Sequence, residues 1–371
     1  MNFRNFSKNT RYTIIIVIVW ALIEAILFKI YGIHTDLEAV KYINQADYYI
    51  KNGRVETGNF WFYSVQIFLI VCVKKFHLPY LMVVVVHWAA SLMAVLSLNR
   101  FIRKLTDSET AFISSIYFLL NIPFFVVNSY LQTESLFFSL TIIFSCFVMR
   151  QEKITWIKLL EIFLFLCIIC LTRPTGLFWI PATLIFLFLN FFKNISLPVK
   201  VVICLASLIG FIAFLNLAMG SGGEFDFMLP FRDECIICGV PTHNADISTS
   251  VNPNSLQGIL FYITHNFSQF SRMAFLHTKA FWGLLRSYYS ISHNVYLAII
   301  YYPLYVLAVF SLPFWFAKRK NILLYCLATI LITWLSVILS CDDWHNRFFL
   351  SIVPYIYILS APAIKKIFGK I

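Results

Sequence analysis

Two acidic residues stand one position apart early in the chain, in the segment Asp36-Leu-Glu38. They follow an apolar run over 12–31, so both carboxylates are expected about one turn beyond the end of a helix. A carboxylate in water can act as a general base toward an acceptor hydroxyl, and two together can hold a divalent cation. An acid in this position is also a common helix N-cap, and Asp36 could cap a helix over 38–51 that stops at Gly53. The residues alone leave both interpretations open.

A second group combines an acid and an arginine at the ends of apolar runs. Glu134 opens one run, and Arg173 lies in the turn Thr172-Arg-Pro-Thr-Gly176 between two others. An arginine at a membrane edge needs an anionic partner or water, and its planar fork matches the oxygens of a lipid phosphate. A structural ion pair between Arg173 and Glu134 would satisfy the same need. Glu134 could also simply favour the dipole of its helix.

A third group precedes the last apolar run, in the segment Cys341-Asp-Asp-Trp-His-Asn-Arg347. Asp342, His345 and Arg347 together could bind a sugar or a phosphate, and Trp344 could stack on a sugar ring. Interfacial tryptophan and arginine are also ordinary residues of the membrane–water boundary. The group is therefore a candidate binding site with a structural alternative.

Cysteines offer a weaker signal. Cys235-Ile-Ile-Cys238 provides two thiols, which are too few for a closed zinc site without a distant partner such as His243. On an oxidising face the two could form a disulfide, and otherwise they are free thiols. The other seven cysteines are expected to be packing residues.

The elements that must position these groups are transmembrane helices. Of the 371 residues, 60% are hydrophobic and 12% are charged, whereas a soluble domain has about a quarter charged residues. Apolar runs of membrane-spanning length recur along the chain, and they do not alternate as barrel strands do. The sequence predicts an all-α, polytopic integral membrane protein. Ten spans are expected, at 12–31, 79–98, 110–128, 132–149, 157–171, 175–192, 199–218, 294–316, 321–340 and 347–364.

The distribution of positive charge predicts the topology. Lysines and arginines cluster at one set of span ends, for example at Arg100, Arg103 and Lys104, and such clusters mark the cytoplasmic side. Both termini are then cytoplasmic, and the net charge of +12 reflects topology rather than nucleic-acid binding. The short apolar segment 61–73 is expected to lie in the outer interface, with a full crossing as an eleventh span as the alternative.

The outer side then carries the candidate groups. It holds a first loop over 32–78 and a long loop over 219–293, which opens with glycines at 220–223 and has an aromatic, basic part at 256–286 typical of a helix along a membrane surface. Residues 1–371 are expected to form a single transmembrane domain without a separate soluble domain. No phosphate-binding loop, dinucleotide fingerprint, nucleophile elbow or zinc-protease motif occurs.

The order of these features resembles the GT-C superfamily of polytopic glycosyltransferases, which includes protein O-mannosyltransferases and bacterial aminoarabinose transferases. The resemblance rests on the first-loop acids Asp36 and Glu38, the turn at Glu134, the Arg173-Pro174 turn, and Arg347-Phe348 before Pro354. It covers most of the chain in layout rather than in strict motif.

This resemblance implies transfer of a sugar from a polyprenyl-phosphate donor to a glycan, lipid or protein acceptor on the outer, non-cytoplasmic face of the cell membrane. In bacteria this membrane would be the inner membrane. Asp36 stands at the place of the essential first-loop acid, and Glu38 would assist positioning or hold Mg²⁺ or Mn²⁺, if any cation is used. Arg173, Arg286 and Arg347 are the implied ligands of the lipid phosphate. Many relatives have adjacent acids, so the Asp-x-Glu spacing leaves either acid as the base.

Two other functions share the membrane-embedded body and the outer polar residues. A polysaccharide polymerase or ligase would use the same lipid carriers. A lipid-linked sugar flippase or transporter would bind the donor without chemistry, although transporters often show paired halves, and no internal repeat is evident in this sequence.

Overall fold

The longest elements are predominantly apolar helices, since in lipid a helix satisfies its backbone polar groups within its own segment. The computed structural model describes residues 7–192, 228–250 and 252–368, together with a few residues between 196 and 226. Within these residues the secondary structure is helical, with two isolated β-bridges and no strands, so the predicted all-α class is confirmed. The protein is a multi-pass membrane protein.

Five helices are long and apolar enough to cross a membrane, counted over the described residues. They correspond to the predicted spans 12–31, 79–98, 294–316, 321–340 and 347–364. The helices are α1 (Lys8–Tyr31), α4 (Leu81–Leu105), α14 (Ile291–Phe310), α16 (Lys320–Ile338) and α17 (Arg347–Phe368).

Four other predicted spans fall on shorter or broken helices. The shorter ones are α7 (Glu134–Met149), α8 (Trp156–Thr172), and a 3-10 turn η4 (Pro174–Phe178) continued by α9 (Trp179–Asn190). With 16 residues, α7 rises about 24 Å, less than a hydrocarbon core of about 30 Å. The predicted span 199–218 and the glycines at 220–223 lie largely or wholly outside the described residues.

The predicted span 110–128 is broken by a bend of 68°. It consists of α5 (Ser108–Leu119), α6 (Ile122–Val126) and a 3-10 turn η3 (Val127–Ser129). Pro123 stands in the first turn of α6, where its missing N–H does no harm, whereas a continuous helix would have lost a hydrogen bond and met a clash there. The bend directs η3 toward the first loop.

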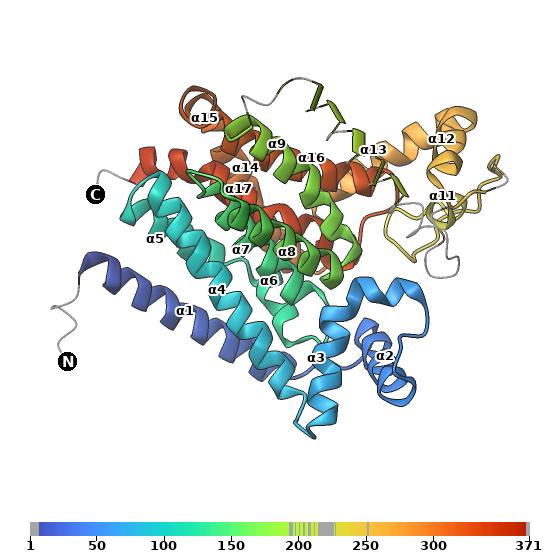
Figure 1. Ribbon diagram of the computed structural model, residues 1–371, viewed down its shortest axis with the longest axis horizontal. Helices are drawn as coiled ribbons and strands as arrows, with labels where there is room; N and C mark the ends of the chain where they lie inside the picture. The colour runs from blue at the N-terminus through green and yellow to red at the C-terminus, as the bar shows by residue number, and fades with distance from the viewer. Residues whose placement is uncertain are drawn as a thin grey trace. The chain divides into compact units, whose positions relative to one another are not determined.

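The chain divides into two compact units. The first comprises Met1–Phe186, Ile299–Cys326 and Val353–Ile371. In it, α4 packs along α7, and α5 lies beside both α1 and α4 (Figure 1). The first loop contains α2 (Glu38–Asn52), a 3-10 turn η2 (Gly58–Tyr63) and α3 (Ser64–Lys75), which pack on one another. The segment 61–73 is therefore a short helix and is not among those of spanning length and composition.

The second unit comprises Leu187–Ala298 and Leu327–Ile352. It contains α11 (Leu229–Arg232), α12 (Leu256–His265), α13 (Phe267–Gly283) and the 3-10 turn η6 (Trp344–Asn346). The expected surface helix over 256–286 is two helices divided at Asn266. A short helix, α15 (Leu312–Lys318), belongs to the first unit and follows α14 at Ser311.

Candidate active site

The first loop is tied to the loop before α7 by backbone pairing. His34 donates its N–H to the carbonyl of Ser129 at 3.0 Å, and its own carbonyl accepts from Leu131 N–H at 3.0 Å. The His34 ring also lies 4.3 Å from the ring of Tyr130, measured between centroids. These contacts fix the position of the chain just before the candidate acids.

Asp36 does not cap the helix that follows it, so that alternative is wrong. The N-cap of α2 is Leu37, in a conformation with φ 53°, and no side chain bonds to the helix N-terminus there. The Asp36 side chain is 68% exposed, and its Oδ1 lies 3.2 Å from His34 Nδ1. An exposed carboxylate that an imidazole orients can accept a proton from a hydroxyl in water.

Glu38 opens α2, which ends at Gly53 as the sequence predicts. Burial raises the pKa of Tyr42 well above the ordinary 10.0, and the negative charges of Glu38 and Glu134 raise it further. The ammonium of Lys41 lies 5.0 Å from the centroid of the Tyr63 ring and faces two more aromatic rings. The sequence patterns did not single out Lys41, since a lysine in an amphipathic helix is ordinary.

Glu134 and Arg173 are brought together, as one of the two sequence interpretations expects. The Arg173 guanidinium donates to Glu134 Oε1. The Glu134 side chain is 0% exposed and that of Arg173 is 13% exposed. Because α8 ends at Arg173 and α7 begins at Glu134, the pair joins two helix ends. The structural ion pair is thus present, and the phosphate role of Arg173 stays a prediction.

Arg286 is the centre of a buried network in the second unit. Its guanidinium donates to the carbonyl of Ala280 at 2.9 Å, to Asn346 Oδ1 at 2.7 Å, and to the carboxylate of Asp342. Asn346 in turn donates to the carbonyl of Leu284 at 3.1 Å. The network joins the end of α13 to the segment before α17, so two predicted site residues, Arg286 and Asp342, are partners of each other.

Arg347 and His345 lie in the same turn. Arg347 opens α17 and donates to Asp343 Oδ1 at 2.7 Å, and the N–H of Trp344 donates to the same oxygen at 2.8 Å. His345 has φ 56° and Asn346 also has φ 56°. Two successive residues with a Cβ in this left-handed region cost about 1–2 kcal/mol each, and the hydrogen bonds of Asp343 and Asn346 hold the turn in place.

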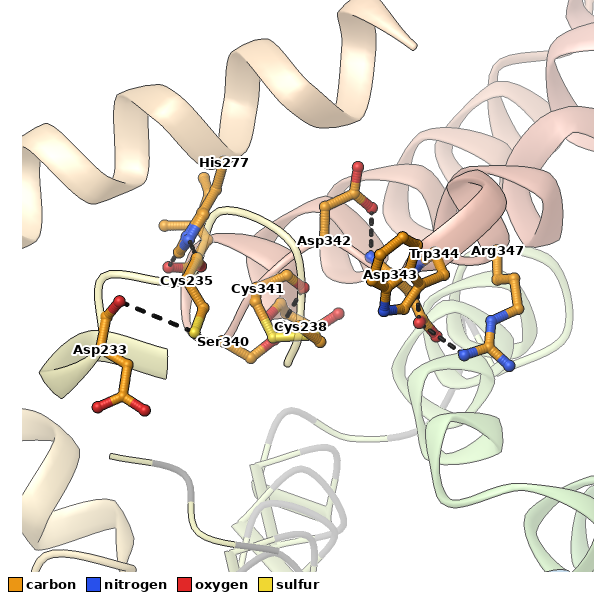
Figure 2. The surroundings of a disulfide bond; sticks show 12 residues. Asp233, Cys235, Cys238, His277, Ser340, Cys341, Asp342, Asp343, Trp344 and Arg347 are labelled. Carbon is orange, nitrogen blue, oxygen red and sulfur yellow. Dashed lines mark hydrogen bonds and ion pairs between the residues drawn. A yellow bond between two sulfur atoms is a disulfide. The ribbon is translucent and has the colours of Figure 1, made fainter. Parts of the chain in front are cut away.

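A disulfide fixes this segment to the long loop (Figure 2). Cys238 is bonded to Cys341, with Cα atoms 5.2 Å apart, whereas Cys235 is a buried free thiol. Cys238 N–H also donates to the carbonyl of Asp342 at 2.8 Å, and Asp342 N–H donates to that of Ile236 at 2.9 Å. Of the two alternatives that the sequence left open, the Cys235–Cys238 disulfide is therefore wrong, and Cys341, which was expected to be a packing cysteine, is not one.

We expect reduction of this disulfide to destabilise the protein by about 2–4 kcal/mol, because the bond closes a long loop in the unfolded chain. The melting temperature of the purified protein should fall when a phosphine reductant is added. Cys341→Ser should melt at the lower temperature with or without reductant. Cys235→Ser, the matched control, should respond to reductant as the wild type does; an unchanged wild-type melting temperature would contradict the expectation.

Asp342 also confers a pH dependence on stability. Burial raises its pKa from the ordinary 3.8 to about 6, although the Arg286 guanidinium opposes the rise. Between these two pKa values the folded state therefore holds a proton that the unfolded state has already released. The contribution of Asp342 to the free energy of unfolding falls as the pH rises from about 4 to about 6. The melting temperature of the wild type should fall relative to that of Asp342→Asn over that interval. A difference in melting temperature between the two proteins that is constant from pH 4 to pH 7 would refute this.

The structure thus groups the predicted site residues within each unit. Glu134 and Arg173 meet in the first unit, and Arg286, Asp342, His345 and Arg347 meet in the second. Among the residues that the structure describes, no three His, Cys, Asp or Glu side chains gather in a way that could hold a metal ion. A Mg²⁺ or Mn²⁺ ion held by Asp36 and Glu38 stays a prediction.

Comparison with known proteins identifies the fold. No protein-family model and no curated protein sequence matches the chain. Among solved structures it is similar to ArnT from Cupriavidus metallidurans in the apo state, with a TM-score of 0.50 and 13% identity. ArnT is an aminoarabinose transferase of the GT-C family. The chain has a GT-C fold. The similarity covers 98% of this chain and 62% of ArnT, so the GT-C body extends over nearly all of the chain while more than a third of ArnT has no counterpart in it.

Proposed function

We propose that the protein is a membrane glycosyltransferase that moves a sugar from a polyprenyl-phosphate donor to an acceptor hydroxyl on the outer face of a cell membrane. The observation that carries the proposal is the GT-C fold, similar to ArnT over 98% of the chain, with an exposed carboxylate, Asp36, directly after the first long helix.

The reaction follows from the residues of the first unit. Asp36 takes the proton of the acceptor hydroxyl while the hydroxyl oxygen attacks the anomeric carbon of the donor sugar. A new C–O bond forms there while the bond from that carbon to the phosphate oxygen breaks, and polyprenyl phosphate leaves with the electron pair. The donor sugar is already activated by its bond to the phosphate, which is a good leaving group, so this reaction needs no nucleotide.

Two features support an outer location for the candidate groups. Disulfides persist in oxidising compartments and are rare in the cytosol. The Cys238–Cys341 bond joins the long loop 219–293 to the turn before α17, and the charge pattern predicts that both lie on the outer side. Membrane-impermeant maleimide added to whole cells after reduction should label these cysteines if the topology is right.

The proposal is tested by sugar transfer in detergent or nanodiscs. Purified protein is mixed with radiolabelled polyprenyl-phosphate sugars and candidate glycan, lipid and peptide acceptors. Consumption of one donor with release of polyprenyl phosphate and labelling of an acceptor is the expected result. A donor that binds and is never consumed with any acceptor would overturn the enzyme assignment in favour of a flippase or transporter.

A further inference from the structure

Two exposed aromatic side chains in the second unit lie next to each other. Tyr288 is 48% exposed and Trp344 is 40% exposed, and their ring centroids lie 5.5 Å apart with an angle of 51° between the planes. Tyr289 supports Tyr288 from the side, edge to face at 4.8 Å. Exposed aromatic residues are common at the ends of membrane-spanning helices, but here two of them, from segments far apart in sequence, lie against each other.

The backbone next to the pair is strained. Trp344 precedes the two left-handed residues His345 and Asn346, and Leu284 on the other side of the network has φ 63°. Residues with a Cβ adopt this conformation at a cost, and such strain gathers at binding sites because the surrounding structure has to enforce it. Here Asn346 provides the enforcement, since it accepts from Arg286 and donates to the Leu284 carbonyl.

Charged groups next to the pair cancel one another. Arg286 is paired with Asp342, and Arg347 is paired with Asp343, so two positive charges face two negative charges. The same Asp343 oxygen binds both Arg347 and the backbone of Trp344, and Figure 2 shows these residues in sequence after the disulfide. A phosphate would have to displace a carboxylate from its arginine and would be repelled by it. Sugar hydroxyls, which donate and accept hydrogen bonds without charge, meet no such penalty.

We propose that Tyr288 and Trp344 form a binding platform for a pyranose ring. The C–H face of the sugar lies against the electron-rich aromatic faces. The identification of this pyranose ring as part of a substrate rests on the proposed function. The same ring chemistry is offered by an acceptor glycan and by the sugar of the donor, and the experiment separates these sources.

The test measures binding without turnover, by saturation-transfer-difference NMR on the purified full chain in nanodiscs. One arm uses methyl glycosides of glucose, galactose, mannose and N-acetylglucosamine, and the other uses the same sugars on a short polyprenyl phosphate. Trp344→Ala and Tyr288→Ala should weaken binding roughly tenfold or more, as loss of an aromatic anchor does at other interfaces. Trp344→Phe and Tyr288→Phe should retain most of it. Trp156→Ala, which removes a tryptophan that is 86% exposed in the first unit, is the matched control and should bind as the wild type does.

Each outcome decides a specific point. Platform-dependent binding of the methyl glycosides identifies the acceptor side, and dependence only in the lipid-phosphate arm identifies the donor sugar. If neither arm distinguishes Trp344→Ala from Trp156→Ala, the platform does not bind sugar and the inference is overturned. Failure of the proposed function is seen separately, as sugar binding that depends on Trp344 in a protein that never transfers sugar.

Discussion

Asp36→Asn should lower the rate of sugar transfer by about 10²–10⁴-fold while the donor still binds, because general-base catalysis typically contributes a factor of this size. The amide keeps the shape of the carboxylate and can still contact His34, but it cannot accept the proton of the acceptor hydroxyl. The Asp36 side chain is exposed and forms no cap on α2, so the substitution should leave stability nearly unchanged. Single-turnover transfer and donor binding are measured on the same preparation.

Glu38→Gln is the matched control, since it makes the same chemical change two residues away. The Glu38 carboxylate acts electrostatically on the buried hydroxyl of Tyr42, and Glu38→Gln should lower transfer much less than Asp36→Asn does. The reverse order of effects would transfer the role of base to Glu38. If both variants transferred sugar at the wild-type rate, the first-loop acids would have no part in the chemistry.

Hydropathy predicted the long helices well because a spanning helix needs only a continuous apolar run. The five helices of spanning length fall on predicted spans, and the end of α2 at Gly53 was predicted from glycine's freedom to adopt positive φ. The break after α5 was missed, because an apolar run has the same hydropathy whether its helix is straight or bent. The proline at 123 was available as a signal, since proline interrupts a helix ladder.

Pairings across the fold were less accessible to sequence reasoning. The Arg173–Glu134 pair could be named in advance because both residues were charges at the ends of apolar runs, each in need of a partner. The Cys238–Cys341 bond joins positions 103 residues apart, and spacing offered only the nearby Cys235 as a possible partner. Tyr288 and Trp344 also come from segments far apart in sequence, so only the structure shows that their rings lie next to each other.

Removal of Arg173 should destabilise the protein by about 3–5 kcal/mol, the usual cost of breaking a buried ion pair from one side. In Arg173→Met the fully buried Glu134 carboxylate loses its guanidinium and must take up a proton or rearrange. The double variant Glu134→Gln/Arg173→Met should regain most of the lost melting temperature, since neither charge then remains. Lys158→Met, which breaks the exposed Lys158–Glu161 pair, is the control and should change stability by less than about 1 kcal/mol.

Donor binding by the double variant then separates the two roles of Arg173. If the arginine serves to neutralise Glu134 and to join the ends of α7 and α8, the stable double variant should bind the polyprenyl-phosphate donor with nearly wild-type affinity. If the guanidinium also holds the lipid phosphate, the double variant should be stable and yet bind the donor at least roughly tenfold more weakly, as expected for the loss of one charge-assisted hydrogen bond. A double variant as unstable as Arg173→Met would contradict the ion-pair account itself, because the cost would then come from lost packing rather than from an uncompensated charge.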